Sequence, residues 1–250
     1  MADNRKRSPA EKCALCLQAA RLCKSHIIPE FCFAPFYDDN HRIIEISDVE
    51  KGKVRRRQKG MWERLLCAKC EALLNRWERL SRRVFTDSLP PHEAGTKRVR
   101  VFQNVDYTPF KLFMLSILWR ASATTHSFFK HVSLGPHHEV IRHMILNGDA
   151  GEAQDYPMMI FALHFQGQRM PDLMFEPTYM RVEGLKCYRF VFTGFVVMIY
   201  VSGQVPSPGF MRWALDPQKP LRIYDGELSE FRFVRDAWNR VAETTKDVLI

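Results

Sequence analysis

The residues that decide the fold are two cysteine pairs, Cys13-Ala14-Leu15-Cys16 and Cys67-Ala68-Lys69-Cys70, which flank Ser25-His26-Ile27-Ile28-Pro29. A gap of two residues lets a tight turn present two thiolates to one ion, and two such turns complete a tetrahedral zinc site. A site closed by four protein ligands normally supports the fold and takes no part in chemistry. We therefore predict a structural zinc ion on Cys13, Cys16, Cys67 and Cys70.

Two other arrangements of these residues are chemically reasonable. Cys23 and His26 are also two residues apart, so together with the first cysteine pair they could form a compact site of three cysteines and one histidine. Alternatively, the four cysteines are buried thiols or disulfides, although pairs at this spacing usually bind metal. We expect the ion to be held by the two outer pairs.

Length and composition place the chain among ordinary globular proteins. Its 250 residues are 46% hydrophobic and 26% charged, enough for one large domain or a small module with a larger one. The polar, basic first residues do not form a signal peptide, and the longest apolar run, 195–201, is too short to span a bilayer. Seven cysteines, an odd number that includes two close pairs, suit a reducing compartment. We expect a cytoplasmic protein without membrane contact.

The positive charge is confined to the part that carries the cysteine pairs. Residues 1–100 contain 22 Lys and Arg against 13 Asp and Glu, whereas residues 101–250 contain 15 of each, so the net charge of +9 belongs to the first part. Concentrated positive charge beside a zinc module is typical of proteins that bind a phosphate backbone. The alternative is a solvated basic surface without a partner. We expect a nucleic-acid partner, with DNA as the first choice.

The segment 51–59 is the most basic stretch of the chain. Six of its nine residues are basic: Lys51, Lys53, Arg55, Arg56, Arg57 and Lys59. Gly52 and Gly60 lie at the edges of the segment. We predict an exposed loop that contacts phosphates, which gives affinity and register without reading sequence. A loop without any partner is the alternative.

The hydrophobic pattern predicts the elements of the first part. Residues 1–12 are expected to form a flexible basic arm, residues 22–36 extended chain and turns, and residues 42–49 a strand. After Cys70 a helix is predicted, because Leu73, Leu74, Trp77, Leu80 and Val84 fall on one face. Pro90 and Pro91 end this helix. We expect a zinc domain over 13–88 and a linker over 89–106.

Residues 107–250 are predicted to form a mixed domain of helices and an antiparallel sheet, which makes the fold class α+β. The pattern indicates a helix from Tyr107 toward Arg120 and a second helix with Pro136 in its first turn. Strands are expected over 156–165, 173–182 and 187–201, the last nearly all apolar and therefore central. An amphipathic helix is predicted over 229–247.

A first C-x2-C turn (a zinc knuckle), a hairpin, and a second C-x2-C turn that opens a helix together describe a treble clef. In their motifs, residues 13–80 resemble HNH-type nucleases. Those proteins commonly show a C-x2-C pair, then Asp-His-Ile-Ile-Pro, then Leu-Leu-Cys-x2-Cys-His. Here the same order reads Cys13-x2-Cys16, Ser25-His26-Ile27-Ile28-Pro29 and Leu65-Leu66-Cys67-x2-Cys70-Glu71. The whole chain also resembles a group of uncharacterised bacterial proteins that add a segment similar to residues 115–121. The first resemblance implies an HNH-like ββα unit around the zinc.

The resemblance also implies a chemistry. Hydrolysis of a phosphodiester needs a base that activates water and a divalent ion that stabilises charge at the phosphate. His26 would be the base, since an imidazole titrates near neutral pH. A magnesium or manganese ion, separate from the zinc, would be the catalytic metal.

The chain departs from that pattern at the metal ligands. Ser25 stands where an aspartate is usual, Glu71 replaces the histidine after the last cysteine, and Trp62 replaces an asparagine that orients the base. Glu71 can ligate a hard cation and Asn75 lies one turn further on, so a rebuilt site of Ser25, His26, Glu71 and Asn75 is conceivable. Two hypotheses follow: a metal-dependent endonuclease, which the retained His26 favours, or an inactive zinc module that binds nucleic acid or a protein partner. In the first hypothesis the second part selects the target or partner.

Overall fold

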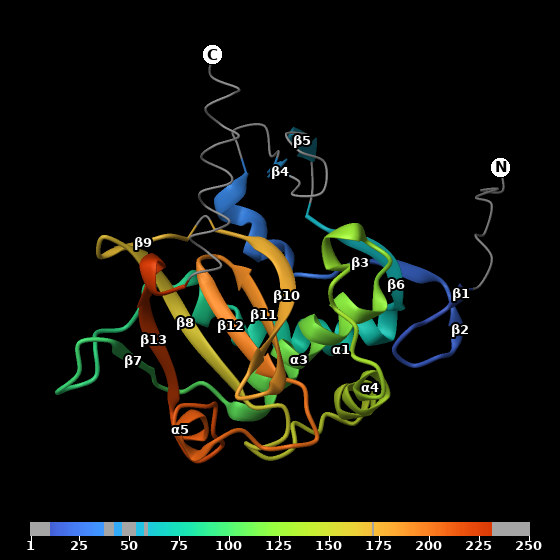
Figure 1. Cartoon of the computed structure of the whole chain (residues 1–250). Helices are drawn as coiled ribbons and strands as arrows, with labels where there is room; N and C mark the ends of the chain where they lie inside the picture. Colours follow the sequence, from blue (N-terminus) through green and yellow to red (C-terminus); the bar gives the residue numbers. More distant parts are fainter. Residues whose placement is uncertain (1–10, 38–42, 47–53, 58–59, 172, 232–250) are drawn as a thin grey trace.

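The computed structural model describes residues 11–37, 43–46, 54–57, 60–171 and 173–231 (Figure 1). Residues 1–10 of the predicted arm, the basic residues Lys51, Lys53 and Lys59, and most of the helix predicted over 229–247 lie outside the described residues. No helix in the described part of the chain is both long enough and apolar enough to cross a membrane.

The first part of the chain consists of short strands and one helix that begins at the second cysteine pair. In chain order the elements are β1 (Glu11–Lys12), β2 (Ala19–Ala20), β3 (Leu22–His26), the 3-10 helix η1 (Glu30–Phe36), β4 (Ile43–Ile46), β5 (Val54–Arg57), β6 (Trp62–Cys67) and α1 (Ala68–Ser81). β1 pairs with β2, β3 with β6 and β4 with β5, all antiparallel. β6 pairs with β3 and leads directly into α1.

The basic segment is a strand where we predicted a loop. β5 pairs with β4, with Arg57 opposite Ile43, Arg56 opposite Ile44 and Arg55 opposite Glu45. The prediction was wrong because charge density carries no information about pairing, whereas β4 supplies backbone groups that pair with those of β5. The predicted strand over 42–49 is confirmed at 43–46, and the extended stretch 22–36 contains β3 and η1.

The second part is one mixed sheet with helices on one side. Its elements are α2 (Arg83–Thr86), β7 (Val99–Phe102), α3 (Tyr107–Ala123), η2 (Ser127–Phe129), α4 (His137–Asn147), β8 (Met158–Phe165), β9 (Gln168–Arg169), β10 (Phe175–Val182), β11 (Leu185–Phe192), β12 (Phe195–Tyr200), α5 (Pro208–Met211), β13 (Leu221–Glu227) and η3 (Leu228–Glu230). The sheet order is β10-β11-β12-β8-β13-β7, and β9 adds to β8. The pairs are antiparallel except for β13 against β8, which is parallel.

Two sequence expectations differ from this sheet. The single strand predicted over 187–201 is a hairpin, because Thr193 and Gly194 adopt φ values of 48° and 67° and reverse the chain between β11 and β12. A Cβ on Gly194 would come within 1.9 Å of the Met170 carbonyl oxygen, so the turn requires glycine. The segment 89–106, expected as a linker, contains β7, which pairs with β13. Hydrophobicity alone could not reveal either feature, because both depend on pairing partners.

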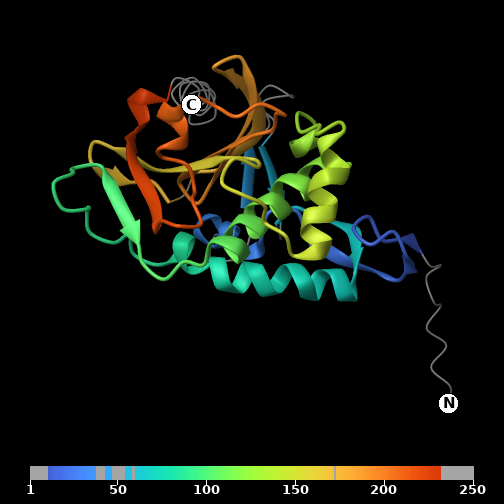
Figure 2. The same ribbon diagram turned by 90° about the horizontal axis from the view of Figure 1, so that it is seen from below.

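Helix α3 is the centre of the hydrophobic core. All its residues from Phe110 to Ala121 are buried, and Figure 2 shows it between α1 and the sheet, with α4 beside it. A helix buried on every side is expected to be apolar all round, as this one largely is. Phe85 of α2 contacts Phe110 on one side and Phe192 and Phe195 of the sheet on the other. One buried cluster therefore runs without interruption from the cysteine pairs to the sheet.

Lys111 is a buried cation within this core and gives a pH-dependent prediction. Its side chain is 1% exposed, and its Nζ donates to Tyr107 Oη (2.7 Å) and Glu152 O (2.5 Å). Burial lowers the pKa of Lys111 from its ordinary 10.5 to about 8. Between these values the unfolded state binds more protons, so stability rises with pH through this window.

We therefore expect the free energy of unfolding of wild type to rise between about pH 7 and about pH 10. Relative to Lys111→Met, the rise should reach up to roughly 3 kcal/mol. Urea unfolding of both proteins at the two pH values measures the difference. The exposed Lys97→Met variant is the control and should track wild type. A constant gap between wild type and Lys111→Met would contradict the burial of a charged lysine.

Candidate metal centre

Four cysteine thiols lie together where β1, β2, β6 and α1 meet. The Sγ atoms of Cys13, Cys16, Cys67 and Cys70 are all within 4.8 Å of one another, and Cys16 and Cys67 are 3.8 Å apart. A zinc–thiolate bond of about 2.3 Å in tetrahedral geometry places two sulfurs about 3.8 Å apart. The spacing of the thiols therefore fits a single metal ion with four sulfur ligands.

A tight turn forms the first half of this cluster. The Leu17 N–H donates to Cys13 O (2.8 Å), the Cys13 N–H donates to Gln18 O (2.9 Å), and Leu17 has φ 62°. The Ala14 N–H donates to Leu65 O (3.0 Å), which ties the turn to β6. These bonds hold both thiols of the first pair toward the second pair.

The second half is built at a helix N-terminus. Cys67 is the N-cap of α1, and its N–H donates to the sulfur of Cys13 (3.3 Å). The positive end of the helix dipole favours thiolates at this place. Burial raises the pKa of Cys67, but hydrogen bonds from the Cys70 N–H and from the neighbouring thiols lower it to about 7.

The donor set is that of a closed site for a sulfur-binding metal ion. Among the described residues it is the only group of three or more Cys, His, Asp or Glu side chains placed to hold a metal. Cys23 and His26 do not belong to this group. The structure therefore does not place them with Cys13 and Cys16 in the compact site of three cysteines and one histidine. All seven cysteines are free thiols, which excludes disulfides between the pairs. Four sulfur donors without an open position are typical of structural zinc.

The second part of the chain anchors the first cysteine turn. Arg142 of α4 is buried, and its Nη1 donates to Leu15 O at 2.8 Å while its guanidinium pairs with Glu139 at 2.8 Å. Arg142 thus links the backbone between Cys13 and Cys16 to α4, a contact that no local pattern in the sequence indicates.

Ser25 and His26 have different surroundings although they are neighbours on β3. Ser25 is fully buried, and its Oγ accepts a hydrogen bond from the Leu66 N–H of β6 (3.1 Å). The His26 side chain is 32% exposed, and its Nε2 lies 2.8 Å from Glu30 Oε2. Tyr37 donates a hydrogen bond to the other oxygen of Glu30. Sequence reasoning missed Glu30 and Tyr37, although Glu30 follows His26 by four residues.

Glu71 lies near a buried arginine of α3. Arg120 is 2% exposed, and its Nη1 donates to His26 O (2.5 Å). Burial lowers the pKa of Arg120, and the nearby carboxylates of Glu78 and Glu71 raise it. Glu71 Oε1 is buried and has no hydrogen-bond partner among the described residues, whereas Asn75, one turn further along α1, is exposed. The arrangement places a protein cation, Arg120, between β3 and the acidic side chains of α1.

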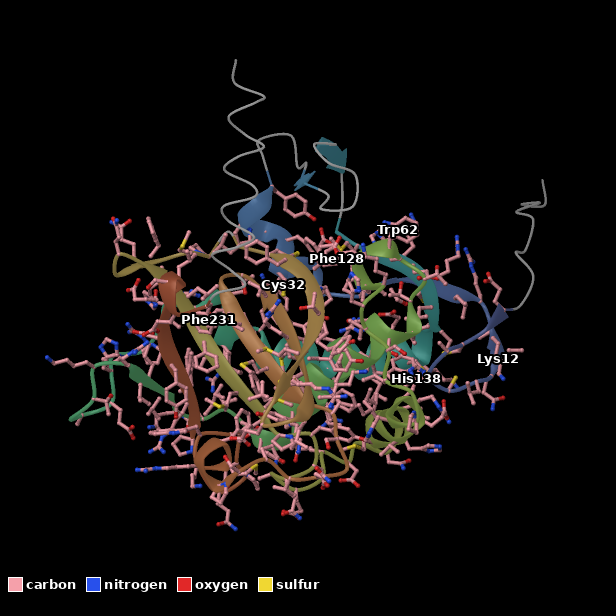
Figure 3. All side chains as sticks on the ribbon, in the orientation of Figure 1. Lys12, Cys32, Trp62, Phe128, His138 and Phe231 are labelled. Atoms are coloured by element: carbon pink, nitrogen blue, oxygen red, sulfur yellow. The ribbon has the colours of Figure 1, made fainter. Side chains whose placement is uncertain are left out.

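Of the six basic residues predicted to bind nucleic acid, the described part of the chain includes three. Arg55, Arg56 and Arg57 lie on β5, in the segment between β3 and β6. At the outer end of β6, Trp62 is 37% exposed, and the Lys24 Nζ lies 4.3 Å from the centroid of its ring. Figure 3 shows Trp62 at the periphery and Cys32, a fully buried thiol of η1, in the interior.

Comparisons of the chain with protein-family models, with curated proteins and with solved structures gave no match.

Proposed function

We propose that this chain is a zinc-stabilised nucleic-acid-binding protein, with Zn²⁺ on Cys13, Cys16, Cys67 and Cys70. The observation that carries the proposal is the position of the basic hairpin. β4 and β5, with three consecutive arginines, are inserted between β3 and β6, and the cysteine cluster holds the end of β6. In Figure 1 the hairpin lies apart from the seven-stranded sheet. A rigid base carrying a basic ribbon suits contact with a phosphate backbone, DNA first.

Two features favour binding without hydrolysis. Ser25 Oγ is buried and already accepts a hydrogen bond from the Leu66 N–H. Glu71 lies near the guanidinium of Arg120, which already supplies positive charge beside it. A buried carboxylate balanced by a fixed arginine has less reason to bind a hydrated Mg²⁺ or Mn²⁺ ion.

A metal-dependent endonuclease is the second candidate, because one specific contact favours it. His26 is partly exposed and its Nε2 contacts Glu30, a carboxylate that can orient an imidazole as the usual asparagine does elsewhere. In this candidate His26 is the base, and Glu71, with Ser25 and Asn75 nearby, holds the magnesium or manganese ion.

The binding proposal predicts a changed salt dependence. Replacing Arg55, Arg56 and Arg57 by glutamine removes positive charges that neutralise phosphates, so the slope of log K against log salt on duplex DNA should flatten by about 0.9 for each arginine that neutralises a phosphate. Fluorescence anisotropy across a salt series measures the slope. A triple variant of exposed basic residues in the second part, Arg181, Arg212 and Lys219, is the matched control. Equal slopes in all three proteins would place the phosphate-binding residues elsewhere.

Plasmid nicking separates the two candidates. We expect wild type to bind DNA and to leave plasmid intact with magnesium, manganese or nickel. Nicking by wild type that His26→Ala and Glu71→Ala both abolish, with zinc content unchanged, would favour the nuclease instead.

A further inference from the structure

A second polar region lies away from the cysteines, where α2 and the edge of the sheet meet. Two adjoining cavities of about 440 Å³ each share Arg100 of β7, His164 of β8 and Gly167 of the following turn. The first is also lined by residues 85–89 after α2 and by Arg169, and the second by His92, Arg98 and Asp225. Neither cavity includes a residue of the proposed zinc site.

Charges in the second cavity are matched within the protein. Asp225 accepts hydrogen bonds from Arg100 Nε (2.8 Å) and Nη2 (2.7 Å), and its Oδ2 lies 2.7 Å from His92 Nε2. Burial raises the pKa of Asp225, but the hydrogen bonds with Arg100 and His92 bring it below its usual value. Arg98 forms an ion pair with Glu230. This cavity therefore offers little unbalanced charge to a ligand.

The first cavity contains a cation without a paired carboxylate. Arg169 Nη1 donates to Leu163 O (3.0 Å) and Gly194 O (2.7 Å), and its Nη2 to Thr193 O (3.3 Å), all of them backbone carbonyls. Among the described residues it forms no ion pair, although Asp225 is near enough to favour its charge and the Phe195 ring centroid lies 4.4 Å from its guanidinium carbon. Burial of a charge is costly unless an opposite charge accompanies it. An anion in the cavity would supply that charge.

An imidazole and a hydroxyl also line the cavity around Arg169. His164 is 6% exposed, and its Nδ1 lies 3.0 Å from Ala162 O, so Nδ1–H donates to the backbone and Nε2 is the acceptor nitrogen of this tautomer. Ser88 contributes a hydroxyl at the rim. Among the described residues that line this cavity, Asp87, which is exposed, is the only acidic one.

We propose that the cavity between α2 and the β8–β9 turn binds the phosphate group of a phosphate monoester. Arg169 and Ser88 offer hydrogen-bond donors, and Arg100, although paired with Asp225, adds the remaining N–H groups of its guanidinium. The three terminal oxygens of a phosphate can accept from more of these donors than the two oxygens of a carboxylate. A volume of about 440 Å³ is also within the range of cavities that hold a nucleotide-sized ligand. This site is independent of the zinc cluster and of the basic hairpin.

The test is calorimetric titration of the full chain with inorganic phosphate, with a nucleoside 5′-monophosphate, and with an oligonucleotide that carries either a 5′-phosphate or a 5′-hydroxyl. Arg169→Gln should weaken binding of the phosphate probes by about tenfold or more, since it removes a charge-assisted hydrogen bond. Arg181→Gln is the matched control, because Arg181 is exposed and donates only to the Gly184 carbonyl (2.8 Å). It should bind as wild type does.

Arg169 also donates hydrogen bonds to three backbone carbonyls, so Arg169→Gln could lose binding through misfolding. A second variant makes the test independent of that outcome. Asp87→Asn removes an acidic side chain at the rim, the only one among the described lining residues, and should tighten phosphate binding roughly threefold. Tighter binding of the 5′-phosphorylated oligonucleotide than of the 5′-hydroxyl form identifies a nucleic-acid end as the source of the phosphate, and binding of the monophosphate alone identifies a small ligand. Absence of phosphate binding at millimolar concentration, or equal weakening in Arg181→Gln, overturns the proposal.

Discussion

Cys67→Ser is expected to abolish metal binding and to unfold the first part of the chain. Cys67 supplies one of the four thiols, caps α1 and donates its N–H to the sulfur of Cys13, so one substitution affects both halves of the cluster. Structural zinc contributes on the order of 10 kcal/mol of apparent folding free energy in small modules. The ligand pairs are also far apart in sequence, and the ion closes the loop between them.

Metal analysis and circular dichroism of the purified proteins test this expectation. Wild type should contain one zinc ion per chain, and Cys67→Ser none, with a weaker helix signal because α1 unfolds. Cys23→Ser is the matched control, because Cys23 lies on the neighbouring strand and outside the cluster. It should keep its zinc. Metal-free wild type that remains fully folded would refute a structural ion, and absence of zinc from Cys23→Ser would restore the compact alternative.

Arg120→Met should destabilise the protein by about 3 kcal/mol or more, because it removes one partner of a buried charge cluster. Arg120 is the cation near Glu78 and Glu71, and it also holds His26 O and Ser116 Oγ. Without it, Arg82 would be the one arginine left near the Glu78 carboxyl, among the described residues, to offset its burial. Burial raises the pKa of Glu78 and Arg120 lowers it, so the substitution should raise the pKa further.

Denaturant unfolding gives the free energies of the variants. The double variant Arg120→Met with Glu78→Gln should recover part of the stability, since no charge is left unmatched at that pair. Arg79→Met, an exposed arginine on α1, should change stability by less than about 0.5 kcal/mol. If Arg120→Met lowers the free energy of unfolding no more than Arg79→Met does, the charges of α1 and α3 do not stabilise one another.

Local sequence was sufficient for features that depend on short spacing and on periodicity. The two C-x2-C pairs indicated the four-cysteine cluster, because each pair needs only a tight turn to aim two thiols. The apolar stripe after Cys70 indicated α1, in which Leu74 and Trp77 are buried. The apolar pattern from Tyr107 indicated α3 in the same way. These elements follow from rules that act within a few residues.

Pairing and burial were decided by the tertiary structure. Arg55, Arg56 and Arg57 were predicted as a loop, yet β4 supplies a partner strand, and the apolar run 187–201 was predicted as one strand although Thr193 and Gly194 turn it back. The surroundings of Ser25, His26 and Glu71 depend on Arg120, which lies 94 residues from His26. Arg142 and Leu15 are further apart still. The sequence determines which groups are available, but only packing brings distant groups together, because contact energies depend on distances in space that local spacing does not encode.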